Sequence, residues 1–200
     1  MNCNQLIDDE QILEAYSIAN IMAKFRINSY GKNPQCLDNT HKDALLYLLK
    51  DDEEILEHCC IHNEFLILNN QKIVKLNNIT IKEELRKKKI MKNILHKNKE
   101  VYKQNGFELI TLKAIRDGVI TWKKLGFEFD NITDEKIILK QFKIYLRKVK
   151  GISDKKFVTI QEIPSRLFFD ETISFTQWLS SKNNANFQHF SMTLRILDDR

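Results

Sequence analysis

The densest group of charged side chains in the sequence is the run ELRKKKIMKNIL at residues 84–95. Nine Lys and Arg lie between Lys82 and Lys103 against three Glu, while the whole chain carries a formal net charge of +5. The positive excess is therefore confined to one segment, and we expect any anion that the protein binds to be met there. An apolar periodicity follows and predicts a helix, whose N-terminal amides also attract phosphate. The alternative is a solvated helix face without a ligand.

Two carboxylates, Glu83 and Glu84, directly follow a strand-like segment and precede the basic run. At a strand end a carboxylate can act as a general base, directly or through a water molecule. The other interpretation is that both acids stabilise the first turn of the helix that follows. His62 and Glu64 flank the preceding strand and are open to either a catalytic or a structural role.

The four cysteines are typical of a reducing compartment and form no disulfide framework. The sequence HCCIH at residues 58–62 lacks a second ligand pair at zinc-finger spacing, so we expect no metal. No apolar run reaches the roughly 20 residues that span a bilayer, and no secretory signal is visible. These features predict a cytoplasmic protein without a membrane segment.

The order of hydrophobic periods predicts a mixed α/β sheet with a parallel crossover. Capping pairs at Asp8 and Gln11 and at Thr40 and Asp43 indicate two of the helices. Asn69-Asn70 is turn material and predicts a hairpin. The predicted helices are 8–26, 40–49, 52–59, 83–104, 117–125, 133–149 and 173–181. The predicted strands are 65–68, 73–81, 107–114, 127–129, 156–160 and 190–197.

Without internal repeats, low-complexity tracts or a convincing linker, the chain is interpreted as one domain over residues 1–200. Its core is expected at 60–130, with helices at 8–60 before it and an extension at 131–200 after it. A set of late aromatic side chains is expected to complete the cover of the sheet or to line a pocket. The set is Phe168, Phe169, Phe175, Trp178, Phe187 and Phe190.

The segment from Phe65 to Asp130 resembles the GCN5-related N-acetyltransferase (GNAT) superfamily. In that family a strand leads into a turn of pattern Arg/Gln-x-x-Gly-x-Gly/Ala that opens a long helix. A Gly precedes the next strand, and a short helix then ends in Gly-Phe. Here the turn falls on RKKKIM at 86–91, Gly106 precedes FELITLKA, and TWKKLGFEF carries Gly126-Phe127. A bacterial subgroup has a Trp in this short helix and an extra helix after the Gly-Phe strand, as this chain does.

The resemblance implies a GNAT-like fold and acetyl-CoA as the co-substrate. It places the pantetheine arm beside the end of the strand and the diphosphate on the turn, with Trp122 near the thioester. The implied acetyl-CoA contacts are Ile79, Thr80, Ile81, Arg86, Lys87, Lys88, Lys89, Ile90, Met91 and Trp122.

This chain departs from the family at three positions. Lys89 and Met91 fill both glycine positions of the turn, which narrows the phosphate cradle although its positive charge remains. Trp122 replaces the family's tyrosine, and an indole N–H is too weakly acidic to protonate the departing thiolate. Trp122 either packs against the pantetheine arm or fills the core.

The predicted function is an acetyl-CoA-dependent N-acetyltransferase that acts on an amine of unidentified class. The alternative is a catalytically inactive GNAT-like binding module whose basic helix at 82–103 meets an acidic partner. Aromatic side chains do not interleave with these lysines, which argues against recognition of nucleic acid by stacking.

Overall fold

The computed structural model describes most of the chain, in two compact units. The first unit comprises Met1–Leu112 with Arg195–Arg200, and the second comprises Lys113–Leu194. Strands β6 (Leu109–Ala114) and β8 (Phe190–Arg195) each cross the boundary between the units. The described residues are 6–18, 21–25, 35–38, 40–50, 60–79, 89–115, 118–153, 157–164, 167, 175–182 and 189–196.

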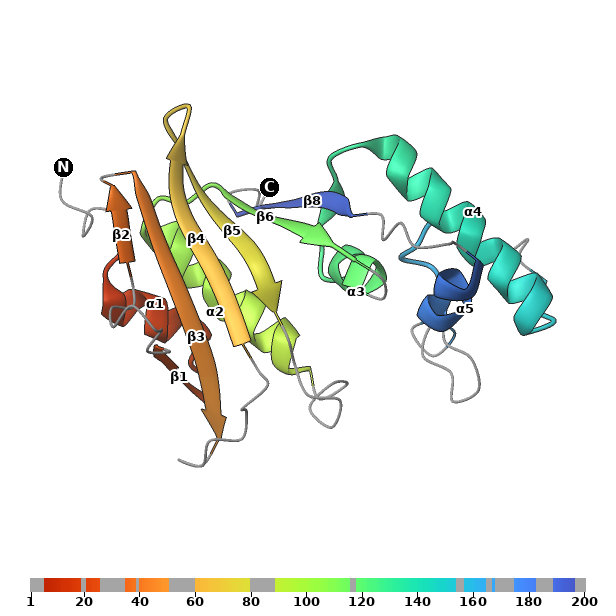
Figure 1. Ribbon diagram of the computed structural model, residues 1–200, viewed down its shortest axis with the longest axis horizontal. Coiled ribbons are helices and arrows are strands. Elements are labelled where there is room, and N and C mark those ends of the chain that lie inside the picture. Colours follow the sequence, from red (N-terminus) through yellow and green to blue (C-terminus); the bar gives the residue numbers. More distant parts are fainter. Residues whose placement is uncertain are drawn as a thin grey trace. The chain divides into compact units, whose positions relative to one another are not determined.

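The first unit is built on a mixed sheet whose strands follow the order β1-β3-β4-β5-β6 (Figure 1). Strand β2 pairs with β3 as well, and all pairs are antiparallel except β5 with β6, which is parallel. The bounds are β1 Ile21–Phe25, β2 Gln35–Asp38, β3 His41–Lys50, β4 Cys60–Leu68 and β5 Gln71–Ile79.

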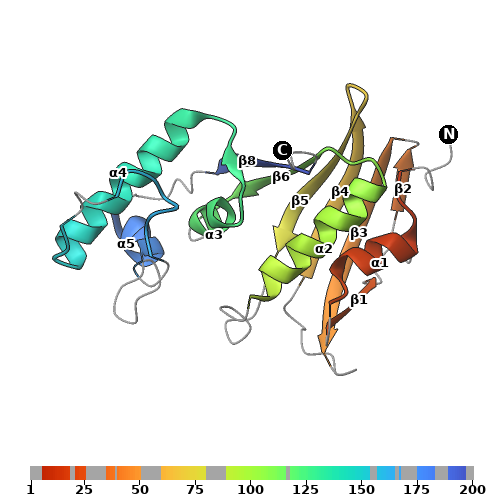
Figure 2. The same ribbon diagram turned by 180° about the vertical axis from the view of Figure 1, so that it is seen from behind.

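Two helices of this unit, α1 (Asp9–Tyr16) and α2 (Ile90–Gln104), lie side by side on one face of the sheet (Figure 2). The strands turn alternate apolar side chains toward them, which buries the core. The aromatic centre of this core joins Phe65 of β4 to Tyr102 and Phe107, with ring centroids 5.7 to 5.8 Å apart. The opposite sheet face carries polar side chains.

The second unit contains α3 (Gly118–Lys124), β7 (Glu128–Phe129), α4 (Ile132–Val149) and α5 (Phe175–Lys182), and β7 pairs antiparallel with β8. The ammonium group of Lys123 is almost fully buried and pairs with Glu128 and, at 3.1 Å, with Glu135. Burial lowers the pKa of Lys123. The two carboxylates outweigh this effect and hold that pKa above its ordinary value. The ion pairs join α3 to β7 and α4.

The prediction of helices throughout residues 8–60 is wrong. The capping box of Asp8 and Gln11 is present, but α1 ends at Tyr16 and is followed by β1. Ser17 has extended backbone angles and its hydroxyl donates to the Leu13 carbonyl at 2.8 Å, which ends the helix. The helix expected at 40–49 is strand β3, whose alternate residues are buried against the helices. The helix expected at 52–59 lies outside the described residues.

The hairpin prediction is confirmed. β4 and β5 pair antiparallel, and both Asn69 and Asn70 have positive φ angles, of 50° and 62°. β4 begins earlier than expected, at Cys60. The helices α3, α4 and α5 and the strands β6, β7 and β8 are also present where the sequence predicts them.

The strand expected at 156–160 is absent from its described part, residues 157–160, in which 158–160 form bends. The Glu162 carboxylate accepts hydrogen bonds from the Val158 and Thr159 amides, at 2.7 and 3.3 Å. These bonds curl the backbone and remove the amides from any strand ladder.

The three late aromatic side chains that the structure describes, Phe175, Trp178 and Phe190, belong to two separate aromatic groups. Phe142 and Tyr145 of α4 pack against Phe175 and Trp178 of α5, with neighbouring centroids 5.2 to 6.2 Å apart. Phe190 of β8 instead contacts Phe129 of β7. Phe168, Phe169 and Phe187 lie outside the described residues. No helix within the described part of the chain is long and apolar enough to cross a membrane.

Candidate functional site

The β5–α2–β6 crossover is the part of the structure that positions the candidate site. β5 and β6 pair in parallel from Ile73 opposite Leu109 to Leu76 opposite Leu112. β5 then continues for three more residues to Ile79. The end of β5 therefore extends past its pairing with β6, at the place where the resemblance implies the pantetheine arm.

The helix α2 begins at Ile90, later than the predicted start at residue 83. Lys89 directly precedes its first turn. Lys89 is exposed and has a left-handed backbone conformation, with φ of 60° and ψ of 11°. A lysine has no acceptor atom, and the Lys89 side chain makes no capping hydrogen bond. The first helix amides thus receive no side-chain cap from Lys89 and remain suited to an anion.

The left-handed conformation of Lys89 is informative because of its position in the sequence. In the resemblance of residues 86–91 to the turn pattern Arg/Gln-x-x-Gly-x-Gly/Ala, Lys89 occupies the first glycine position. Non-glycine residues with positive φ are uncommon, and the conformation costs a lysine about 1–2 kcal/mol relative to the right-handed region. The backbone therefore keeps the conformation that glycine favours, although its side chain is lysine.

The other predicted acetyl-CoA contacts fall partly within the described chain. Ile79 is the last residue of β5 and is half-buried. Ile90 and Met91 open α2 and are half-buried as well. The remaining predicted residues of the strand end and turn lie outside the described residues: Thr80, Ile81, Glu83, Glu84, Arg86, Lys87 and Lys88.

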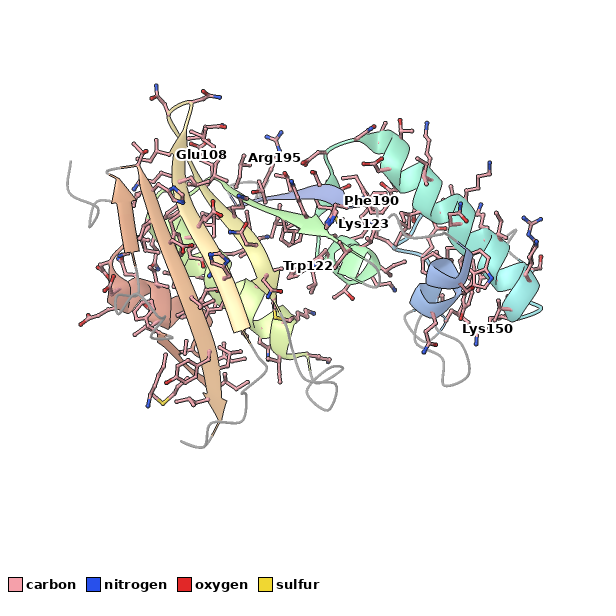
Figure 3. The ribbon with its side chains drawn as sticks, viewed as in Figure 1. Glu108, Trp122, Lys123, Lys150, Phe190 and Arg195 are labelled. Carbon is pink, nitrogen blue, oxygen red and sulfur yellow. The ribbon has the colours of Figure 1, made fainter. Side chains whose placement is uncertain are left out.

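Trp122 lies on α3, next to Lys123 in sequence (Figure 3). Its ring meets Phe127 edge-on, with centroids 5.2 Å apart, and it is half-buried. A Cβ added at Gly118 would stand 3.5 Å from the indole nitrogen, so the ring also packs over that glycine. Trp122 thus has a packing role within the second unit.

A cluster of ionisable side chains, which we call the polar face, lies on the sheet side opposite α1 and α2. Asp43 of β3 is opposite Glu64 of β4, which is opposite Lys75 of β5. His62 is diagonal to Asp43, and its Nε2 lies 2.6 Å from the Asp43 Oδ1. His41 Nε2 lies 3.6 Å from the Glu64 Oε2. These side chains come together only because β3 is a strand.

Glu64 is the most constrained member of the polar face. Lys75 Nζ donates to both of its carboxylate oxygens, at 3.1 and 3.2 Å, and the Asn77 amide donates to one of them. Burial raises the pKa of Glu64. The hydrogen bonds and the positive charge of Lys75 outweigh this effect and hold that pKa below its ordinary value. Glu64 therefore stays ionised and fixes the charge of the cluster.

The sequence analysis left the roles of His62 and Glu64 open and did not identify Asp43 as a partner of His62. The signal that could have found the pair is the alternation of buried Lys42, Ala44 and Leu46, which places Asp43 on the other face. Within the described chain no group of three or more His, Cys, Asp and Glu is arranged to hold a metal ion.

A buried polar group lies under the sheet on the helix side. The hydroxyls of Tyr16 on α1 and Tyr102 on α2 are 3.2 Å apart, and both rings are fully buried. Burial raises the pKa of Tyr16 to about 12. Both hydroxyls therefore stay protonated at neutral pH and join the two helices.

Two basic side chains of α2 already have partners. Lys97 Nζ lies 2.6 Å from the Glu14 carboxylate of α1, and His96 lies 3.4 Å from Glu100. The basic side chain at the start of α2, Lys89, is by contrast at the helix end where an anion is best stabilised.

Comparison with models of known protein families and with curated proteins found no match. Solved structures to which the chain is similar include the PaiA N-acetyltransferase of Thermoplasma acidophilum in complex with coenzyme A, at 23% identity and a TM-score of 0.34. The match covers 44% of this chain and 53% of that one. This chain thus spans about half the length of that structure.

Two further solved structures match over more of the chain. A GNAT-family acetyltransferase of Staphylococcus aureus Mu50 has 14% identity and a TM-score of 0.39, covering 77% of this chain and 68% of that chain. An acetyltransferase of Bacillus subtilis in complex with coenzyme A has 16% identity and a TM-score of 0.38, covering 78% of each.

The chain's own element order defines its fold. An antiparallel hairpin, a helix that crosses to a parallel strand, and a short helix before Gly126-Phe127 follow one another as the sequence predicts. The chain therefore has a GNAT-like α/β fold, with helices flanking a mixed sheet and an extra helix, α4, after the Gly-Phe strand.

Proposed function

We propose that this chain is an acyl-CoA-dependent N-acetyltransferase, which moves an acetyl group from acetyl-CoA to an amine. The observation that carries the proposal is the left-handed Lys89, which directly precedes α2 in the β5–α2–β6 crossover. A lysine is held there in a backbone conformation that its residue type disfavours. Such retained strain is typical of functional sites.

The start of α2 suits a diphosphate on physical grounds. The unpaired amides of its first turn and the helix dipole favour negative charge. A residue in the left-handed region next to right-handed residues also forms a concave group of amides that binds anions. The Lys89 ammonium adds a full positive charge at the same end. These residues would hold the nucleotide part of acetyl-CoA.

The strand β5 would hold the pantetheine arm. Its last residues, from Asn77 to Ile79, continue beyond the pairing with β6 and bring an extended backbone toward the turn. The single-domain organisation over residues 1–200 belongs to the proposal as well, because an acyltransferase of this kind needs both the crossover and the elements that follow it. The amine acceptor would approach from the polar face.

The alternative, an inactive module that binds an acidic partner through residues 82–103, has less support on the described part of the helix. The positive charge of Lys97 is already offset by Glu14, and His96 pairs with Glu100. The helix therefore presents less unpaired charge to a macromolecular partner than its sequence indicates.

A thermal-shift titration with acetyl-CoA tests the proposal. Ligand at about 100 times its Kd should stabilise the protein by roughly 2.7 kcal/mol, which corresponds to several degrees in Tm. Lys89→Glu should abolish most of this shift, since it places a negative charge beside the diphosphate.

The matched control is Lys103→Glu, which makes the same charge change at the far end of α2. It should leave the ligand-induced shift close to that of the native protein. Absence of any shift in the native protein at millimolar acetyl-CoA, or equal shifts in both variants, would contradict the proposal.

A further inference from the structure

The polar face offers a second group of residues for the reaction, on the same unit as the start of α2 but on different strands. His62 lies opposite Asn78 of β5 in the strand register, one residue before Ile79. The imidazole is therefore beside the segment of β5 that continues past β6. If acetyl-CoA lies along that segment of β5, His62 is the described imidazole nearest to the thioester of acetyl-CoA.

The geometry points to a defined proton pathway in the His62–Asp43 pair. We propose that this pair is the acceptor side of the site, where His62 takes a proton from a cationic primary amine and Asp43 orients the imidazole. This inference rests on the proposed function and deepens it by naming the acceptor class and the residues that meet it.

The tautomer follows from the short contact between the two side chains. An ionised Asp43 carboxylate only accepts hydrogen bonds, so His62 Nε2, 2.6 Å from its Oδ1, carries the hydrogen. The lone pair of the neutral ring is then on Nδ1, which is left to accept a proton. A carboxylate that fixes one ring nitrogen in this way also stabilises the imidazolium that forms.

The charge of the polar face selects for a cation. Asp43 and Glu64 are negative and Lys75 is positive, so the cluster has one net negative charge when both histidines are neutral. An ammonium group offsets that charge, and transfer of its proton to His62 leaves the cluster neutral. The Glu64 carboxylate is held by Lys75 and Asn77 and does not compete for the proton.

The protons and bonds balance along this route. One ammonium proton goes to His62 Nδ1 and then to water, which leaves a neutral amine. The amine nitrogen bonds to the acetyl carbon as the carbon–sulfur bond breaks, a second proton passes from nitrogen to the departing thiolate, and the third stays on the amide product. A thiol pKa near 8.5 makes the thiolate a fair leaving group even though Trp122 supplies no acid.

The experiment compares the native protein with His62→Gln, Asp43→Asn and the control His96→Gln, which changes an exposed histidine of α2. Thiol release from acetyl-CoA is measured with a thiol reagent, using ethylamine, ethanolamine and Nα-acetyl-lysine as probe amines. The stabilisation by acetyl-CoA is measured for each variant as well.

His62→Gln should lower kcat by about 10² or more, while the acetyl-CoA stabilisation stays native. Asp43→Asn should also lower kcat by about 10² or more with native acetyl-CoA stabilisation, because the asparagine amide no longer holds the tautomer whose free lone pair is on Nδ1. The other groups that face His62 are Glu64 on its own strand, His41 and Tyr47 on β3, and Lys75 on β5. None of these changes in either variant. His96→Gln should behave as native.

Rescue with imidazole provides a readout that a structural role would not move. His62→Ala should regain thiol release when imidazole is added, as free base, whereas the native rate should not rise. A native kcat and pH profile for His62→Gln would overturn the inference. The inference would also fail if acetyl-CoA stabilises the native protein but no probe amine raises thiol release above the enzyme-free rate. Absence of stabilisation by acetyl-CoA would instead contradict the proposed function itself.

Discussion

At the scale of single residues, the start of α2 is defined by backbone conformation as much as by side-chain chemistry. Lys89 carries a positive charge that the sequence makes visible, but its left-handed backbone is visible only in the structure. A lysine can hold a left-handed conformation when the surrounding elements over-determine the backbone.

Replacement of Lys89 by glycine should stabilise the folded chain. Glycine removes the cost of about 1–2 kcal/mol of the left-handed conformation. Its larger conformational entropy in the unfolded chain lowers the free energy of unfolding by about 0.4–1 kcal/mol. We expect a net gain of about 0.5–1 kcal/mol in the free energy of unfolding, measured with urea. Lys99→Gly, inside α2, should instead lose about 1 kcal/mol. Destabilisation by Lys89→Gly would show that the left-handed assignment is wrong.

Glu64 gives a prediction about pH. Its folded pKa is below the unfolded value of 4.5, so its contribution to stability is complete above that pH and is lost as pH falls through the folded pKa. Glu64→Gln should therefore be less stable than the native protein near neutral pH, and the difference should shrink in acid. Urea midpoints at about pH 7 and about pH 3 measure this. The control is Glu10→Gln, which changes an exposed side chain of α1. A stability difference between the native protein and Glu64→Gln that does not depend on pH would refute the prediction.

At the scale of elements, the sequence predicts well where its signals are local. Asn69-Asn70 marks the hairpin, and Asn105-Gly106 and Gly126 end α2 and α3 with glycine φ angles of 73° and 98°. These signals depend on a few neighbouring residues, so no tertiary information is needed to read them.

The elements that were mispredicted depend on distant partners. Leu45, Leu48 and Leu49 have helical spacing behind Thr40 and Asp43, which imitates a capped helix. In the structure the same stretch alternates, and pairing with β1 on one side and β4 on the other makes it a strand. An apolar run of this length fits either period, and only the tertiary context decides. Because the helix assignment hid β3, it also hid the Asp43–His62 pair.

The hairpin turn can be tested by substitution at Asn70. Its φ of 62° and that of Asn69, 50°, are the positive values that glycine and asparagine tolerate best. Asn70→Gly should be neutral to stabilising by about 0.5 kcal/mol, whereas Asn70→Val should cost about 1–2 kcal/mol, since a β-branched residue is strained there. Thermal unfolding measures both, and equal stability of the two variants would contradict the turn assignment.

At the scale of the whole molecule, the chain divides into two compact units, while the proposal treats it as one domain. The strands β6 and β8 run through the boundary, and the Ile196 amide donates to the Glu108 carbonyl at 2.9 Å within the first unit. Shared strands are expected to make the two units unfold together.

Cooperative unfolding can be followed with one probe in each unit. Both tryptophans, Trp122 and Trp178, lie in the second unit, so their fluorescence reports on it alone. The amide signals of Phe65 and Val74 report on the first. A single domain should give one urea midpoint by both probes, and two separate midpoints would establish independent domains.

We propose that the first amides of α2, directly after the left-handed Lys89, bind the diphosphate of coenzyme A. The most direct measurement follows the backbone amide signals of the isotope-labelled protein as coenzyme A is added. The account predicts that the largest shifts occur at Ile90, Met91 and Lys92, with little change at residues 100–104 at the other end of the helix. Unchanged signals at the start of α2 at millimolar coenzyme A, or shifts confined to other elements, would contradict it.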